Sequence, residues 1–218
     1  MKNTVLRIFL DREIANFYLY LNILDEELSL KSEEVSTSID GTYKELNEIS
    51  LNEERNKELI SLMVEADRVK EFTNLMRQSF LTSLYSFMEL WLVRACYIDS
   101  KLRDGGVSYE SINKKKKGIK KAKEYFSRIM KSNYPFDSSQ DRDWITNFQL
   151  LRDCIIHRQG SLTGHSDFEI DPILAKFVTT ENGLSLFEVE NRQIFVEYEF
   201  CVKALKIVHK FMVELLSL

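Results

Sequence analysis

The chain has 218 residues, of which 44% are hydrophobic and 29% are charged, so it can bury a core and fits one large domain or a core with an added subdomain. The formal net charge of -4 and the pI near 5.6 exclude a nucleic-acid binder that is basic as a whole, so any contact with RNA must come from a local patch. Only seven glycines and two prolines interrupt the sequence, which favours a fold built mainly of α-helices.

The cysteines indicate the redox environment. Cys96, Cys154 and Cys201 are widely spaced and odd in number, which fits neither a disulfide framework nor a CxxC metal site. We expect buried free thiols in a reducing cytosol, and hence a cytoplasmic protein. The apolar run at the N-terminus is too short for a signal peptide with a cleavage site, and nothing else approaches a membrane span, so no membrane partner is expected.

The first half of the chain predicts helical segments separated by a turn. Apolar residues recur at three- and four-residue steps over residues 5–31, and Ser, Thr, Asp and Gly then cluster over residues 33–43. Ser50 and Glu53 form a capping-box pattern, which indicates the start of a helix. A further helix with a broad apolar face is expected over residues 70–103.

The second half predicts three more helices and one hairpin. The helices are expected over residues 109–131, 141–158 and 192–216. The segment 177–189 alternates between apolar and polar residues around Asn182-Gly183, a pattern that is typical of a β-hairpin. The whole chain therefore predicts an all-α fold with one small β-hairpin before the last helix.

The segment RDCIIHR, residues 152–158, places an arginine, an aspartate and one of the three histidines at the end of the helix expected over residues 141–158. On a helical wheel, the apolar residues of this helix form one stripe, whereas Asp153 and His157 share the opposite face because they are four residues apart. Arg152 lies between the two faces. In a monomer, Asp153 and His157 are therefore expected to contact water.

Two interpretations fit this helix end. In the first, basic residues satisfy the last carbonyl groups and complement the helix dipole at a solvent-facing C-terminus. In the second, the segment is a phosphate-cleaving site. Arg152 then offers a planar fork to phosphate oxygens, His157 exchanges a proton near neutral pH, and Asp153 accepts a hydrogen bond from the imidazole.

Arginine, a polar residue, three further residues and histidine, followed by a glycine turn, resembles the R-x4-6-H motif of the HEPN superfamily (higher eukaryotes and prokaryotes nucleotide-binding domains). In this chain the motif reads R-D-C-I-I-H from Arg152 to His157, with Asp153 as the polar residue. A long apolar helix precedes it and an amphipathic helix closes the chain, so the resemblance covers residues 68–218. Residues 1–67 are then an N-terminal helical extension.

The resemblance implies a HEPN-like four-helix bundle that forms a symmetric homodimer, in which the motif helices of two copies face each other across a cleft. Many family members are metal-independent ribonucleases, often toxins or abortive-infection effectors in antiviral defence. Others are binding modules without activity. We therefore expect an endoribonuclease that acts on RNA without a cofactor, with an antitoxin or another defence-system protein as a further partner.

The chemistry implied for such a site is attack of an RNA 2′-hydroxyl on the adjacent phosphorus, which leaves a 2′,3′-cyclic phosphate. The His157 imidazoles of two copies would act as base and acid, and Arg152 would stabilise charge on the phosphate oxygens. No metal site is expected, because the histidines are far apart in the sequence and no HExxH or Cys/His cluster occurs. Asp153 stands where the family often has asparagine, and it adds negative charge near the phosphate.

Basic residues near the motif are candidate RNA contacts. Arg158 directly follows the motif. The lysine-rich segment 113–123 fits either a solvated helix face or a phosphate-binding strip that offsets the acidic chain. Its candidate contacts are Lys114, Lys115, Lys116, Lys117, Lys120 and Lys121.

Two further residues could support or join the site. Glu89 is a charge within an apolar helix face, so we expect it either to pair with an arginine such as Arg152 or to lie at the edge of that face. Cys154 lies three residues before His157, but burial as a small side chain is favoured over a role as nucleophile.

Two other functions remain open from the sequence. One is a catalytically inactive HEPN-like module that binds a nucleotide or a protein in the same cleft. The other is an unrelated helical scaffold in which RDCIIHR is accidental. Degradation of RNA in EDTA would separate the ribonuclease from both, and a strictly monomeric protein would argue against a HEPN-type assembly.

Overall fold

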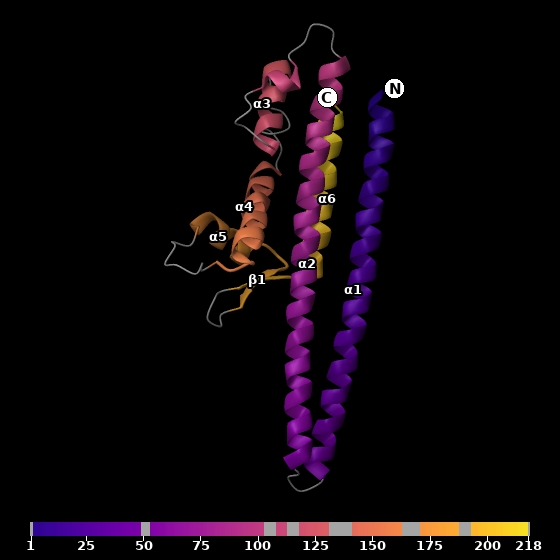
Figure 1. Cartoon of the computed structure of the whole chain (residues 1–218), viewed down its shortest axis with the longest axis vertical. Coiled ribbons are helices and arrows are strands. Elements are labelled where there is room, and N and C mark those ends of the chain that lie inside the picture. The colour runs from indigo at the N-terminus through magenta and orange to yellow at the C-terminus, as the bar shows by residue number, and fades with distance from the viewer. Residues whose placement is uncertain are drawn as a thin grey trace.

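The computed structural model describes residues 2–48, 53–102, 108–112, 118–130, 141–162, 171–187 and 193–217. Within these ranges the chain forms α-helices, one short 3-10 helix and one two-stranded antiparallel hairpin, which directly precedes the last helix as the sequence predicts. The molecule is elongated, because its two longest helices form a pair that extends well beyond the other elements (Figure 1).

Helix α1 (Lys2–Glu48) is continuous, so the turn expected over residues 33–43 is wrong. Hydroxyl groups in that segment donate to backbone carbonyls one helical turn earlier: Ser38 to Glu34 O at 2.9 Å and Thr42 to Ser38 O at 3.0 Å. The polar side chains are thereby satisfied within the helix. Burial of the inner side of α1 against the next helix outweighs the local preference of these residues for a turn.

Helix α2 (Glu53–Leu102) runs antiparallel to α1, and it joins the helix expected to start near Glu53 and the helix expected from residue 70 into one continuous helix. Ser50 of the expected capping box lies outside the described residues. Every seventh residue along the inner side of α1 is buried: Ile14, Leu21, Leu28, Val35 and Thr42. Such a repeat is typical of two helices that wind around each other. The domain boundary expected between residues 67 and 68 falls inside α2.

Helix α6 (Tyr198–Leu216) packs against both α1 and α2, and it begins six residues later than the helix expected from residue 192. The three helices share one core, so α1 contributes to the same hydrophobic cluster as the C-terminal part of the chain. The largest fully buried side chains of this cluster are Tyr85, Tyr125, Phe80, Phe148, Phe200 and Phe211.

Helices α3 (Gly118–Met130) and α4 (Arg142–Arg158) follow one another along one side of α2 (Figure 1). The helix expected over residues 109–131 is therefore shorter, and the 3-10 helix η1 (Tyr109–Ser111) takes its first residues. By contrast, α4 matches the helix expected over residues 141–158 to within one residue at its start. These two helices position the candidate site beside α2.

The segment between α4 and α6 differs most from its prediction. Helix α5 (Pro172–Thr180) includes the first residues of the expected hairpin, because Asp171 caps it and accepts a hydrogen bond from Ile173 N at 2.9 Å. The strands are β1 (Leu184–Phe187) and β2 (Gln193–Val196), paired antiparallel. Asn182-Gly183 precede β1, so they do not form the turn between the strands.

Candidate functional site

The motif residues lie on the solvent-facing side of the last two turns of α4. The residues that α4 buries are Trp144, Ile145, Phe148, Leu151 and Cys154. The Arg152 side chain is 25% exposed and that of Asp153 41%, while His157 is exposed at the end of the helix. This distribution agrees with the helical wheel, which puts Arg152 at the border of the core.

The end of α4 is fixed by a left-handed residue and by contacts with β2. Gln159 has φ 54°, and the next amide, Gly160 N, donates to Cys154 O at 3.3 Å. Ile194 N of β2 donates to Gly160 O at 2.9 Å. A left-handed residue followed by such a bond ends a helix sharply. His157 is thus held in a helical turn whose exit is tied to the hairpin.

Cys154 has no features of a nucleophile. Its thiol donates to Ser161 O at 3.3 Å, and burial raises its pKa to about 11. A thiol with such a pKa stays protonated near neutral pH and is a weak nucleophile. Cys96 and Cys201 are also buried, and all three cysteines are free thiols, which confirms that part of the sequence analysis.

The Arg152 guanidinium is oriented by two neighbours. Its Nη1 donates to Asp153 Oδ1 at 2.8 Å, and its Cζ lies 5.5 Å from the centre of the Tyr85 ring, which comes from α2. Arg152 Nε and the Tyr85 hydroxyl are both buried without a hydrogen-bond partner in the described part of the chain. Burial, and secondarily the charge of Glu89, raise the pKa of Tyr85 well above its usual value.

Glu89 lies beside Arg152, but the two side chains form no ion pair within 4.0 Å. Burial raises the pKa of this carboxyl, whereas the charge of Arg152 and the amide of Ile119 lower it. Because Ile119 is in the first turn of α3, Glu89 also receives the positive end of that helix dipole. Glu89 therefore interacts electrostatically with both the start of α3 and the arginine of α4.

The candidate RNA contacts are spread over two helices. Arg158 is exposed at the end of α4, and Lys120 is exposed on α3. Lys121 is half-buried, with Nζ 4.5 Å from the centre of the Tyr109 ring, so its charge already has a partner. Lys114, Lys115, Lys116 and Lys117 lie outside the described residues, as does His165.

A cavity beside the motif was not expected from the sequence. It lies between α2, the end of α4 and β2, and its volume is about 650 Å³. Asn74 and Gln78, four residues apart on the inner side of α2, hold β2 in place: both side-chain amides donate to Ile194 O at 3.0 Å. Two amide residues four positions apart, at the start of a long apolar helix segment, are the signal in the sequence from which this cavity could have been expected.

Other site types find no support in the described residues. No group of three or more His, Cys, Asp or Glu side chains there is arranged to hold a metal ion. His209 instead pairs with Asp11 of α1, with Nε2 2.8 Å from Oδ1. None of the helices within the described ranges is long and apolar enough to cross a membrane. Comparison of the chain with protein-family models, with curated proteins and with solved structures finds no match.

Proposed function

We propose that this protein is a metal-independent endoribonuclease of the HEPN type, which cleaves RNA between two copies of the chain. The observation that carries the proposal is the pairing of an oriented arginine with an exposed histidine on one helix. Arg152 is held by Asp153 and Tyr85, while His157 forms no hydrogen bond or ion pair with any described residue. A preorganised cation and an available imidazole on one helix are the kinds of group that phosphodiester cleavage uses.

The spacing of the two residues supports a site shared by two copies. His157 lies five positions after Arg152. This spacing corresponds to about 7.5 Å along the helix axis and about 140° around it. Side chains that diverge by this angle from one helix do not converge on a single phosphate. A second copy, related by a two-fold axis, would bring a second arginine and a second histidine to the same phosphate.

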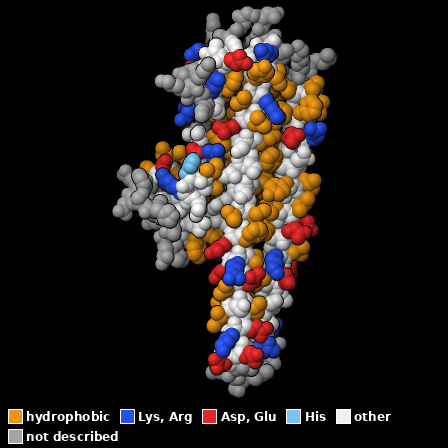
Figure 2. Space-filling view, in the orientation of Figure 1, with side chains coloured by type: hydrophobic (Ala, Val, Ile, Leu, Met, Phe, Trp, Pro, Cys, Tyr) orange, Lys and Arg blue, Asp and Glu red, His pale blue; other side chains and the backbone are white. Residues whose placement is uncertain are grey.

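Exposed apolar side chains near the motif support the same arrangement. Ile156, next to His157, is 46% exposed, and Leu75 on α2 is 57% exposed at the same cavity. Figure 2 shows hydrophobic side chains along much of both long helices on this face. Contiguous apolar surface of this kind is typical of protein interfaces.

In the proposed reaction, one His157 removes the proton from a ribose 2′-hydroxyl, whose oxygen then forms a bond to the adjacent phosphorus. The bond from phosphorus to the 5′-oxygen breaks, and the second His157 donates a proton to that oxygen. Arg152 stabilises the charge on the non-bridging oxygens. The products carry a 2′,3′-cyclic phosphate and a 5′-hydroxyl, and no metal, oxidant or reductant is consumed.

The test is cleavage of a labelled RNA by the purified protein in EDTA, with analysis of the product ends. We expect cyclic phosphate ends and a loss of activity of about a hundredfold or more in His157→Ala, because proton transfer contributes factors of this size. His209→Ala is the matched control, since His209 pairs with Asp11 away from α4. Equal cleavage by wild type and His157→Ala would refute the role assigned to His157.

A second candidate, a catalytically inactive binding module, is favoured by one feature. The charge of Arg152 is already paired with Asp153 at 2.8 Å, which leaves less of it for a phosphate. Binding of RNA without cleavage would select this alternative. A role as a growth-arresting defence effector is proposed for the active form only, and it predicts that induced expression stops growth in wild type but not in His157→Ala.

A further inference from the structure

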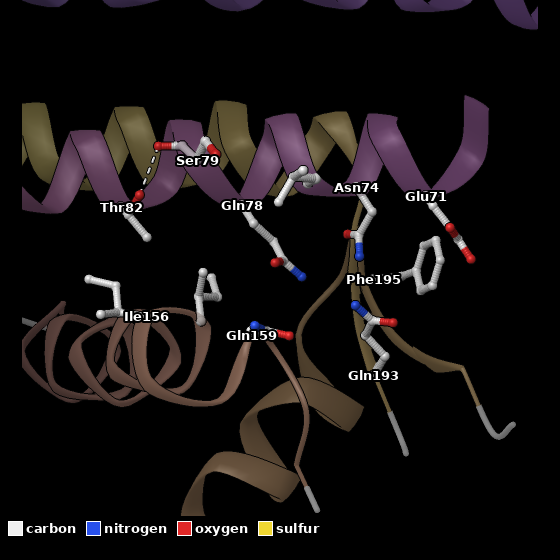
Figure 3. A pocket seen from close by; sticks show the side chains of 11 residues that line it. Glu71, Asn74, Gln78, Ser79, Thr82, Ile156, Gln159, Gln193 and Phe195 are labelled. Carbon is white, nitrogen blue, oxygen red and sulfur yellow. Dashed lines mark hydrogen bonds between the residues drawn. The ribbon is translucent and has the colours of Figure 1, made fainter. Parts of the chain in front are cut away.

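The cavity beside the motif is lined by both uncharged polar and apolar side chains. Gln78 projects from α2 toward the end of α4, where Gln159 lies, and Gln193 and Phe195 approach from β2 (Figure 3). Ser79 and Thr82 of α2 add hydroxyl groups, and the hydroxyl of Thr82 donates to the backbone carbonyl of Ser79 at 2.9 Å. The side chains around the cavity thus come from three elements and offer both donors and acceptors.

Gln78 has hydrogen-bonding capacity that the described residues do not use. It is only 3% exposed, and its Nε2 donates to Ile194 O at 3.0 Å. Its Oε1 accepts no hydrogen bond from a described residue, although the side chain lines the cavity. This acceptor faces the cavity, so it is available to a donor that a ligand supplies there.

The charge of the lining decides which part of an RNA would fit. Glu71 is the one charged residue that lines the cavity, and no lysine or arginine does. A phosphate at this wall would therefore meet the Glu71 carboxylate, while the ammonium of Lys70, 5.2 Å from the centre of the Phe195 ring, already has that ring as a partner. A nucleobase is uncharged, carries donors and acceptors along its edge, and has a flat face that packs on an aromatic ring such as Phe195.

Gln159 supports a ligand-binding role independently. It is the one residue other than glycine with positive φ in the described part of the chain. Glycine is favoured at this position of a helix end, because a side chain there strains the backbone. Gln159 nevertheless lines the cavity, and it lies two residues after His157. A side chain with amide donors and acceptors at a strained position beside a cavity is the kind of feature that often marks a ligand site.

We propose that this cavity binds one unpaired nucleobase of the RNA, next to the phosphate at which His157 acts. The inference rests on the proposed ribonuclease function for its substrate, but the base-binding step does not require cleavage. Gln78 and Gln159 hydrogen bond to the edge of the base, and Phe195 packs against its face. The cavity therefore makes cleavage depend on the identity of the base on one side of the cleaved bond.

The test uses a fluorescent pentanucleotide in which every ribose is 2′-O-methylated, so that no 2′-hydroxyl is available for attack. A second set of oligonucleotides lacks the base at one position at a time. We expect loss of one particular base to weaken binding by wild type about tenfold and loss of the others to have little effect. Gln159→Gly should bind the complete oligonucleotide about fivefold more weakly and should respond less to loss of that base.

Gln159→Gly suits this test because glycine adopts the backbone conformation of residue 159 without strain. Gln149→Ala, on the same helix but outside the cavity lining, is the matched control and should bind as wild type does. Phe195→Leu keeps apolar volume but removes the aromatic face, and it should also weaken binding. The inference is overturned if the wild type does not bind the oligonucleotide, if all base positions count equally, or if Gln159→Gly binds as wild type.

The two proposals fail in different ways. Cleavage of RNA that depends on His157, together with equal effects at all base positions, overturns the base cavity and leaves the ribonuclease. Binding that depends on one base and on Gln159, without any cleavage of unmodified RNA, overturns the ribonuclease and leaves the base cavity.

Discussion

The guanidinium of Arg152 lies over the ring of Tyr85, with its Cζ 5.5 Å from the ring centre. Tyr85 is itself packed edge-to-face against Phe148 of α4, with the ring centres 5.6 Å apart. The ring therefore has a fixed position between the core and the motif. Of the groups in this contact, the aromatic face carries the interaction, because the Tyr85 hydroxyl is buried without a hydrogen-bond partner in the described part of the chain.

Two substitutions of Tyr85 should distinguish the contribution of its ring from that of its hydroxyl group. Tyr85→Phe keeps the face under Arg152, so we expect RNA cleavage near that of wild type and stability within about 1 kcal/mol of it. Tyr85→Leu removes the face, and cleavage should fall about tenfold, in line with the strength of a partly buried cation–π contact. Cleavage rates are compared at a temperature where circular dichroism shows both variants folded. A loss in Tyr85→Phe as large as that in Tyr85→Leu would contradict the assignment.

Replacement of Asp153 by asparagine should strengthen binding of RNA. The amide oxygen of asparagine can still accept from Arg152 Nη1, as Asp153 Oδ1 does at 2.8 Å, but it carries no negative charge. Affinity for the 2′-O-methylated oligonucleotide should rise about two- to fivefold at about 50 mM salt, and the gain should shrink at about 300 mM as charges are screened. The comparison of Kd values at both salt concentrations checks this. Asp143→Asn, in the first turn of the same helix, is the matched control.

The sequence predicts the motif helix well but not the groups that surround the motif. Spacing within one helix places Asp153 beside Arg152 and puts His157 on the outer face, and the structure agrees. Tyr85 and Glu89 come from α2, more than 60 residues earlier, and their approach depends on how the helices pack. Periodicity carries no information about that packing.

The prediction of elements fails where tertiary contacts outweigh local preference. Residues 33–43 have the composition of a turn, yet their hydroxyl groups bond within α1 and its inner side is buried. The segment 177–180 has the β-branched residues of a strand, yet the cap at Asp171 and the proline after it begin a helix that includes them. The second error was avoidable from the sequence, because both start signals are visible there.

Replacement of Glu89 by glutamine should change how stability depends on pH. Burial raises the folded-state pKa of Glu89 above its ordinary value of 4.5, so above that pH the folded chain holds this proton more tightly than the unfolded chain does. In the wild type, the contribution of Glu89 to the free energy of unfolding therefore decreases as the pH rises from 4.5 through the raised pKa. Glutamine has nearly the same shape as glutamate and does not titrate.

The free energy of unfolding of Glu89→Gln, minus that of wild type, should therefore increase as the pH rises above 4.5 and level off once Glu89 is ionised in the folded chain. Urea unfolding at several pH values measures this difference, from which the other titrating groups cancel. A difference that stays constant or decreases over this range would contradict the prediction.

Gly118, at the start of α3, should tolerate no side chain while Glu89 is in place. Its φ is +54°, and a Cβ on it would overlap Glu89 Oε1. Gly118→Ala should lower the free energy of unfolding by about 2–3 kcal/mol, from backbone strain together with displacement of the carboxylate. In a Glu89→Ala background the overlap is gone, so the same substitution should lower it by only about 1–2 kcal/mol. Equal losses in both backgrounds would show that the carboxylate does not fill this space.

Gly41 of α1 provides the opposite case and the control for this series. A Cβ on Gly41 meets no atom within 4 Å, and its backbone is that of an ordinary helix. Gly41→Ala should therefore raise the free energy of unfolding by about 0.5–1 kcal/mol, because alanine loses less backbone freedom on folding. The same urea experiment measures it. A gain at residue 41 and a loss at residue 118 would separate the two effects of a glycine, since the first reflects backbone entropy and the second reflects backbone strain together with the space that Glu89 occupies.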